Sequence, residues 1–154
     1  MGDEKFIVAT SGYFDPLHVG HLELIDHSRR LADENNGKLV VIVNNDEQAR
    51  LKKGEVFMSQ EDRTKIVAAL KQVDEVFLSV DKDKSVCESL RAVKPNIFAN
   101  GGDRTEGEIP ETPVCKEVGI EIIDGLGEKI RSSSEIIGRI KEVEEKRKEF
   151  TKPS

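Results

Sequence analysis

The sequence predicts an α/β protein with a Rossmann-like, doubly wound parallel sheet of five strands, folded as a single domain. Three observations predict this fold. Short apolar, β-rich runs alternate with helical patterns along the chain. Such alternation is typical of βαβ units, which build parallel sheets with helices on both faces. The length of 154 residues suits one domain with its own core.

Five segments have the composition expected of buried strands. Each is short, rich in apolar and β-branched residues, and bounded by polar or turn-forming residues. The predicted strands are residues 6–11, 39–44, 73–79, 95–100 and 119–124.

Apolar residues at helical spacing occupy most of the segments between these strands. Gly37 is expected to cap the first helix. The segment before Ser59, which carries Lys52 and Lys53, is expected to be a polar, flexible loop. The predicted helices cover residues 18–35, 59–70, 84–93, 112–118 and a last segment from Ser132.

Composition excludes several classes of protein. The net charge of −6 and the pI of about 5.2 argue against a broad nucleic-acid surface. The apolar run "KLVVIV" is too short to span a membrane, and the acidic start "MGDEKFIV" is no signal peptide. Cys87 and Cys115 form no CxxC pair and are expected to be reduced thiols in a cytoplasmic protein. No residues have the spacing of a metal site.

The stretch "SGYFDPLHVGHLELI" follows the first predicted strand and begins a helix. Gly12 and Pro16 suit a sharp turn. The free N–H groups and positive dipole end of the helix favour phosphate, and Gly20 lets a ligand approach the backbone. His18 and His21, three residues apart, lie on one helix face and could bind the same polyphosphate. The alternative is a capping histidine beside a histidine with purely structural hydrogen bonds.

"GYFDPLHVGH" resembles the GTFDxxHxGH motif of the HxGH nucleotidyltransferase superfamily, and the resemblance extends from Phe6 to about Ile140. It implies transfer of AMP or CMP from ATP or CTP to a phosphorylated acceptor, with release of pyrophosphate. It suggests a homodimer as well. Tyr13 stands where the family often has Thr or Ser, so only its backbone N–H can take that role. The resemblance assigns Asp15 to the acceptor.

Residues 50–77 are similar to related cytidylyl- and adenylyltransferases, which have a basic loop, an ExR and a VDEV. The resemblance implies that Lys52 and Lys53 close over phosphates as catalytic cations. It implies that Arg63 holds an acceptor phosphate. The alternatives are a solvated loop, and an arginine that pairs with Glu61 or Asp62.

"KPNIFANGGDRTEGEIPE" (94–111) resembles a stretch of heptose-1-phosphate adenylyltransferases. Gly102 and Asp103 would meet the nucleotide, although GGD is also ordinary turn chemistry. Asn100 replaces a lysine of that family and Arg104 replaces an aromatic residue, and both changes bear on the choice of acceptor or base.

"GEKIRSSSEII" (127–137) is similar to the closing element of the family. Its serines would bind the β- and γ-phosphates, although Ser132 and Glu135 also form a capping box. Glycerol-3-phosphate cytidylyltransferases have an arginine where this chain has Gly127, so Arg131 or Lys129 would replace it. The nucleotide-binding candidates are therefore Gly12, Tyr13, Phe14, Gly20, Gly102, Asp103, Arg131, Ser132, Ser133 and Ser134.

Together these residues predict an enzyme without a covalent nucleophile. The acceptor phosphate would attack the α-phosphorus in line, while His18, His21, Lys52 and Lys53 stabilise the charge. Mg²⁺ would bridge phosphate oxygens, held by substrate and water. We expect residues 1–140 to form the nucleotidyltransferase domain and residues 141–154 to be a charged helix end and tail. The alternatives are a non-catalytic nucleotide sensor and, more weakly, a dinucleotide-binding oxidoreductase without GxGxxG.

Overall fold

The computed structural model describes residues 5–101 and 109–124, and in them five parallel strands form one sheet in the order β3-β2-β1-β4-β5. In this order β1 lies at the centre, with Val8 opposite both Leu39 of β2 and Ile97 of β4. This is the predicted doubly wound α/β sheet, so the expected fold class is confirmed. The strands are β1 (Ile7–Gly12), β2 (Lys38–Val43), β3 (Glu75–Leu78), β4 (Ile97–Asn100) and β5 (Glu121–Asp124).

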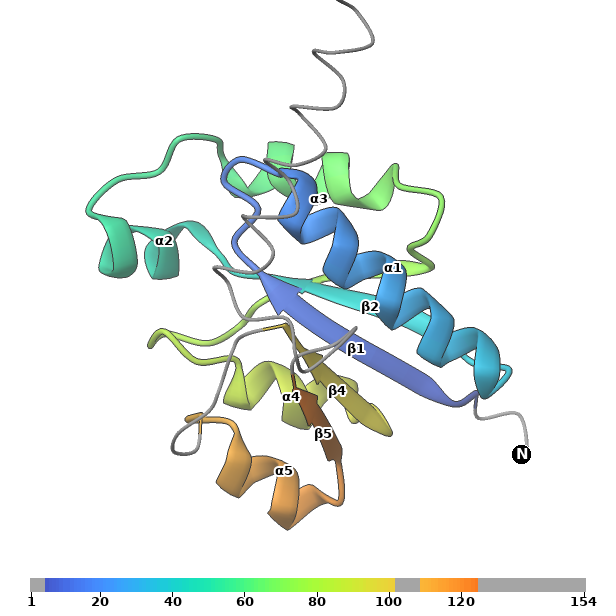
Figure 1. The fold of residues 1–154 in the computed structure, drawn as a ribbon. Coiled ribbons are helices and arrows are strands. Elements are labelled where there is room, and N and C mark those ends of the chain that lie inside the picture. Colours follow the sequence, from blue (N-terminus) through green and yellow to red (C-terminus); the bar gives the residue numbers. More distant parts are fainter. Residues whose placement is uncertain (1–4, 102–108, 125–154) are drawn as a thin grey trace, which may run out of the picture.

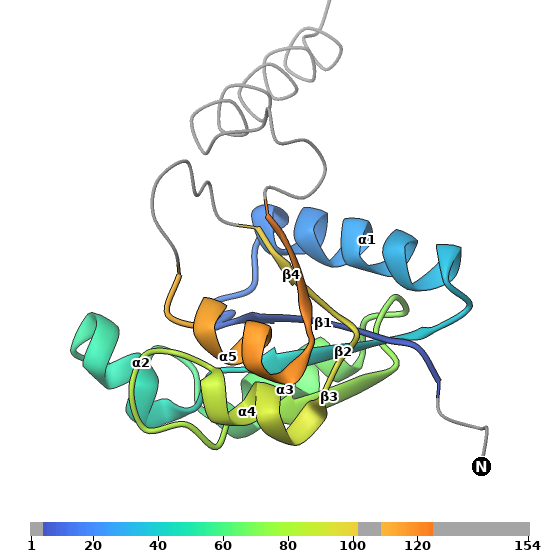
Figure 2. The same cartoon turned by 90° about the horizontal axis from the view of Figure 1, so that it is seen from below.

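Helices cover both faces of the sheet. Helix α1 packs against β1 and β2, and α3 packs against β2 and β3. Helices α4 and α5 lie on the opposite face from α1, as Figures 1 and 2 show. The helices are α1 (Val19–Glu34), α2 (Asp46–Lys53), α3 (Gln60–Ala68), α4 (Cys87–Val93) and α5 (Thr112–Val118).

The core has two parts because neighbouring residues of a strand point to opposite faces. On β1, Val8 belongs to the cluster under α1 and α3, which also contains Ile25 and Val67. Its neighbour Ala9 belongs to the cluster under α4 and α5, together with Leu90. Because both faces are buried, β2 reads as a continuous apolar run.

One predicted loop is a helix. Residues 46–53 form α2, and Lys52 and Lys53 lie in its last turn. The helix begins with a capping box between Asn45 and Gln48, and Gly54 ends it in the left-handed conformation. The expectation of a flexible loop for the two lysines is therefore wrong, and their backbone is fixed by helical hydrogen bonds.

The predicted role of Gly37 needs correction. Helix α1 ends at Glu34, and Asn36 takes the left-handed conformation with a φ of 52°. Gly37 lies against the start of β1, where a Cβ would collide with the carbonyl of Phe6. Position 37 therefore requires glycine, because the two backbones approach each other too closely for a Cβ.

No helix within residues 5–101 and 109–124 is both long and apolar enough to cross a membrane. The predicted last helix from Ser132 and the expected boundary at residue 140 lie outside the described residues.

Candidate functional site

A cavity of about 630 Å³ lies at the carboxyl ends of β1 and β4. Its walls come from the β1–α1 turn, the first turns of α1, the end of α2 and the end of β4. In parallel sheets ligands bind at this edge, where the chain switches direction between strands. The cavity brings together these sequence-predicted residues: Gly12, Tyr13, Phe14, Asp15, His18, Gly20, His21, Lys52, Lys53 and Asn100.

Four further residues that were not among the predicted site residues also line the cavity. Ser11 is the next-to-last residue of β1, Pro16 lies in the turn, and Gly101 follows β4. Leu24 lies one helical turn after His21, and helical spacing alone would have placed it on the same face.

The two histidines form the capping box of α1. His18 is the N-cap, and its Nδ1 accepts a hydrogen bond from the backbone N–H of Gly20 at 3.2 Å. Nδ1 of His21 accepts from the backbone N–H of His18 at 3.1 Å. The rings stack with their centroids 3.7 Å apart, and both imidazoles line the cavity.

These bonds fix the tautomer of both rings. An Nδ1 atom that accepts a hydrogen bond carries no proton, so the proton of each neutral ring is on Nε2. Burial, and then the charge of His18, lower the pKa of His21 to about 4. At neutral pH His21 is therefore an uncharged donor. Its Nε2–H can donate a hydrogen bond to an anion, but the neutral ring lacks the second proton that an imidazolium could give up as a general acid.

The same bonds change the expected phosphate cradle. The sequence predicts free N–H groups at the start of α1. In the structure the N–H of His18 and of Gly20 are bound by the imidazoles, and that of His21 by the carbonyl of His18. The donors that remain here for a phosphate are the Nε2–H groups and the N–H of Val19, with the helix dipole, and the capping alternative holds for both Nδ1 atoms.

Two glycines of the motif make room for neighbouring rings. A Cβ at Gly20 would lie 3.1 Å from Cε1 of His18, and a Cβ at Gly12 would lie 2.8 Å from Cζ of Phe14. Phe14 is buried and meets His21 edge-on, with 4.8 Å between ring centroids. The glycines thus permit the packing that sets the position of both imidazoles.

Lys53 and Asp15 join the end of α2 to the β1–α1 turn. The Lys53 ammonium donates to the carboxylate and the carbonyl oxygen of Asp15, both at 3.0 Å. The carboxylate is buried and also accepts the backbone N–H groups of Phe57 and Met58. Burial alone would raise the pKa of Asp15, but these hydrogen bonds outweigh it and hold that pKa below its ordinary value. The predicted acceptor role does not fit this carboxylate, because loop and lysine donors occupy it.

Lys52 has a different partner. Its Nζ lies 4.6 Å from the centroid of the Tyr13 ring. Both residues line the cavity. Among the described residues, no salt bridge joins Lys52 to a carboxylate, whereas Lys53 is paired with Asp15. Of the two predicted cations, Lys52 is the one whose charge is not neutralised by Asp15.

Arg63 is buried inside the protein, so the prediction that it holds an acceptor phosphate does not fit. Its side chain is 0% exposed and bonds neither Glu61 nor Asp62. Nε donates to the carbonyl of Met58. Nη1 and Nη2 donate to the remaining three acceptors, which are the carbonyls of Tyr13 and Asn44 and the carboxylate of Asp46. The guanidinium therefore links β1, β2, α2 and α3 behind the site.

The remaining candidates come later in the chain. Asn100 reaches the cavity at the end of β4. The other predicted residues lie outside the described part of the chain, and their assignments stay predictions. They are Gly102, Asp103, Arg104, Arg131, Ser132, Ser133 and Ser134.

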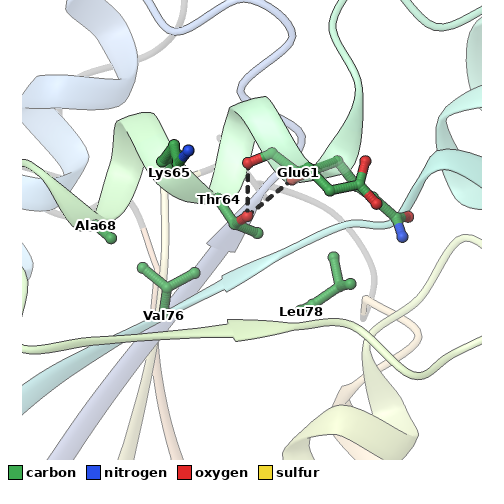
Figure 3. Close-up of a pocket in the computed structure, with 7 residues that line it drawn as sticks. Glu61, Thr64, Lys65, Ala68, Val76 and Leu78 are labelled. Atoms are coloured by element: carbon green, nitrogen blue, oxygen red, sulfur yellow. Dashed lines mark hydrogen bonds between the residues drawn. The ribbon is translucent and has the colours of Figure 1, made fainter.

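A second cavity, of about 610 Å³, lies between α3 and the edge strand β3. Figure 3 shows Val76 and Leu78 of β3 facing Thr64 and Ala68 of α3. The Thr64 hydroxyl is bound within its own helix, to the carbonyls of Gln60 and Glu61. None of the sequence-predicted site residues lines this cavity, so the first cavity is the candidate site.

The donor set at the site does not form a metal centre of its own. Within the described residues, no group of three or more His, Cys, Asp or Glu side chains could hold a metal ion. The carboxylate in the cavity, Asp15, already accepts three hydrogen bonds from the chain.

Comparison with known proteins agrees with this geometry. Residues 9–150 match the family described as cytidylyltransferase-like. The chain is 37% identical over 121 residues to the bifunctional protein HldE of Desulfatibacillum aliphaticivorans, covering 77% of this chain and 24% of that protein. It is 38% identical over 97 residues to the FAD synthase of Methanopyrus kandleri, covering 63% of each chain.

A solved structure has a similar fold. The lipopolysaccharide core biosynthesis protein from Thermoplasma volcanium superposes with a TM-score of 0.63 and 26% identity, covering 79% of this chain and 96% of that one. The chain spans about a quarter of the length of the HldE relatives that it matches. With the family matched over residues 9–150, and with two stacked histidines at the expected edge of the sheet, the chain belongs to the cytidylyltransferase-like family.

Proposed function

We propose that this protein is a nucleotidyltransferase. It moves AMP or CMP from ATP or CTP to a phosphorylated sugar or small alcohol and releases pyrophosphate. The observation that carries the proposal is the pair of stacked imidazoles at the cavity, each with its proton on Nε2. The family match and the HldE and FAD synthase relatives support it.

The reaction needs no covalent intermediate on the protein. A phosphate oxygen of the acceptor attacks the α-phosphorus of the nucleotide, and the bond from that phosphorus to the bridging oxygen of pyrophosphate breaks. The Nε2–H groups of His18 and His21 donate to phosphate oxygens as charge moves to the leaving group. Lys52 places a positive charge in the same cavity. Catalysis then consists of orientation and charge stabilisation by groups fixed before the substrate arrives.

Mg²⁺ would reach the site bound to the nucleotide substrate. A divalent ion binds triphosphate oxygens and water readily and uses few protein ligands. It would neutralise the charge of the triphosphate, and the described residues contribute hydrogen bonds and the Lys52 charge instead of a ligand cluster.

The base and the acceptor follow from weaker signals. The resemblance of residues 94–111 to heptose-1-phosphate adenylyltransferases favours ATP and a sugar phosphate, whereas the match to the cytidylyltransferase-like family keeps CTP among the candidates. The FAD synthase relative adds a flavin phosphate to the acceptors worth testing. The homodimer and the boundary at residue 140 belong to the same proposal.

A pyrophosphate-release screen with Mg²⁺ tests the proposal. It crosses ATP, CTP, GTP and UTP with sugar 1-phosphates, glycerol-3-phosphate, phosphocholine, phosphoethanolamine and flavin mononucleotide. We expect release with one nucleotide and one class of acceptor, and none when the acceptor is omitted. A protein that binds nucleotide by calorimetry but releases no pyrophosphate with any acceptor would support the alternative of a non-catalytic sensor.

A further inference from the structure

We propose that Tyr13 is a positioning residue whose ring holds the Lys52 ammonium at the cavity, and that Lys52 rather than Lys53 is the α2 cation that contacts phosphate. The catalytic part of this inference rests on the proposed function. The placement of Lys52 by the ring does not.

The geometry is that of a cation–π contact. Nζ of Lys52 lies 4.6 Å from the centroid of the Tyr13 ring, inside the range of about 6 Å in which the negative ring face attracts a cation. The two residues come from different elements. Tyr13 follows β1, and Lys52 lies in the last turn of α2. The contact therefore joins the β1–α1 turn to the end of α2.

Lys53, its neighbour, has a structural partner instead. Its ammonium is bound to the Asp15 carboxylate, whose side chain is 0% exposed. That carboxylate would be left with a weaker set of donors if Lys53 moved to a phosphate, which is costly for a buried charge. Lys52 contacts only the face of a neutral ring, so its N–H groups can meet an arriving phosphate while the ring still holds the ammonium, and no buried charge is left unpaired.

The ring, and not the hydroxyl, accounts for the contact. The Tyr13 hydroxyl oxygen is buried and has no hydrogen-bond partner within the described residues. Burial, and then the charge of Glu111, raise the pKa of Tyr13, so its hydroxyl stays protonated and uncharged. A phenylalanine at this position would keep the π face and lose only an unsatisfied polar group.

Holding Lys52 matters because a free lysine side chain has much rotamer entropy, about 2 kcal/mol. A lysine already docked on Tyr13 is near the phosphate site before the substrate binds, so less of that entropy is lost during the reaction. A threonine or serine at position 13, as the family often has, offers no such face. The proposed placement of Lys52 therefore depends on an aromatic ring at position 13.

The first experiment measures the placement without any activity. Lysines are reductively methylated with ¹³C and observed by NMR, and the Lys52 signal is identified by its loss in Lys52→Arg. In the wild type and in Tyr13→Phe we expect this signal to be shifted upfield by the ring current. In Tyr13→Leu, which keeps an apolar side chain but has no ring, it should move to the position of an exposed lysine. A Lys52 signal at the same position in the wild type and in Tyr13→Leu would overturn the placement.

The second experiment measures the consequence. Tyr13→Phe should keep kcat within about two-fold, whereas Tyr13→Leu should lower it about 3- to 30-fold, the range of a cation–π contact. In a Lys52→Met background, Tyr13→Leu should cause no further loss, since the two residues act together. Lys53→Met serves as the matched control: in its background the effect of Tyr13→Leu should persist in full.

The possible failures are distinguishable. Equal losses from Tyr13→Leu with and without Lys52 would overturn the positioning role, because the ring would then act by another route. If the wild type transfers no nucleotide at all, the proposed function fails, and the NMR result alone decides the placement of Lys52. Circular dichroism melts of Tyr13→Leu establish that the variant is folded, and Tyr13→Phe carries the comparison as the less disruptive change.

Discussion

The imidazoles of His18 and His21 each use their two nitrogens for different purposes. Nδ1 holds the start of α1, and Nε2 carries the proton that can meet a phosphate. The capping alternative and the catalytic prediction are therefore compatible. Each imidazole accepts a backbone N–H at the start of α1, and the same hydrogen bond orients the ring.

Substitutions of His18 can separate these two roles. Asparagine is among the preferred N-cap residues and places an oxygen near the position of Nδ1, so His18→Asn keeps the cap and removes Nε2. We expect a loss of about 10²–10³ in kcat, as for one oxyanion donor, with an almost unchanged urea midpoint. His18→Ala should lose kcat similarly and also about 0.5–2 kcal/mol of unfolding free energy. Near-wild-type turnover in His18→Asn would contradict the donor role.

The lowered pKa of His21 leads to a prediction of how the free energy of unfolding depends on pH. The folded protein keeps His21 neutral down to a pH of about 4, whereas the unfolded chain protonates it at its ordinary pKa of 6.5. Between these values the unfolded state binds more protons, so this residue makes the protein less stable as the pH falls from 6.5 towards 4. Urea unfolding at pH 7 and pH 5 should therefore show a larger loss for the wild type than for His21→Asn. Equal losses would mean that the pKa of His21 is not lowered.

At the scale of elements, the connection from α2 to α3 is fixed by two buried charges. Asp15 accepts the N–H groups of Phe57 and Met58 from the segment between the helices. Arg63, on α3, donates to the carbonyls of Tyr13 and Asn44 at the ends of β1 and β2. The backbone that carries Lys52 is thereby held against the β1–α1 turn.

Arg63 should accordingly determine stability. Arg63→Met leaves Asp46 and three carbonyls without their donor, and we expect a loss of roughly 3–5 kcal/mol in unfolding free energy. Lysine cannot reproduce the planar fork, so Arg63→Lys should recover only part of it. Lys65→Met, an exposed position on the same helix, is the control and should change stability by less than about 0.5 kcal/mol. A fully stable Arg63→Lys with only a raised acceptor KM would restore the predicted acceptor role.

At the scale of the whole molecule, the site depends on segments far apart in sequence. The turn after β1, the end of α2 and the end of β4 form one cavity because parallel strands end at the same edge of the sheet. A ligand in that cavity contacts all three and so stabilises the folded domain as a unit.

The substrate nucleotide should therefore raise the unfolding temperature. Binding at 100 times Kd adds about 2.7 kcal/mol, so thermal unfolding with Mg²⁺ and each of four nucleoside triphosphates should single out the base used. The shift should be smaller in His18→Asn at equal concentration. If no nucleotide changes the unfolding temperature of the wild type, the cavity is not a nucleotide site.

The sequence by itself determined the features that depend on local pattern. Alternating strands and helices fixed the fold class, since each apolar run must be buried between helices. The HVGH stretch predicted the candidate site, because a turn, a glycine and two imidazoles three residues apart lie within one helical turn, and His18, Gly20 and His21 do line one cavity. Helix α2 was missed although its signals are equally local: Asn45 and Gln48 form a capping box, and Gly54 ends the helix.

Only the tertiary structure decided the roles of the charged residues. The sequence predicts that Asp15 and Arg63 contact the acceptor, but both are buried against partners about 40 to 50 residues away in the chain. Lys52 and Lys53 are adjacent in sequence, yet one faces an aromatic ring and the other a buried carboxylate. A sequence pattern shows which charges are present. The burial and the partners that set their chemistry arise when distant segments pack together.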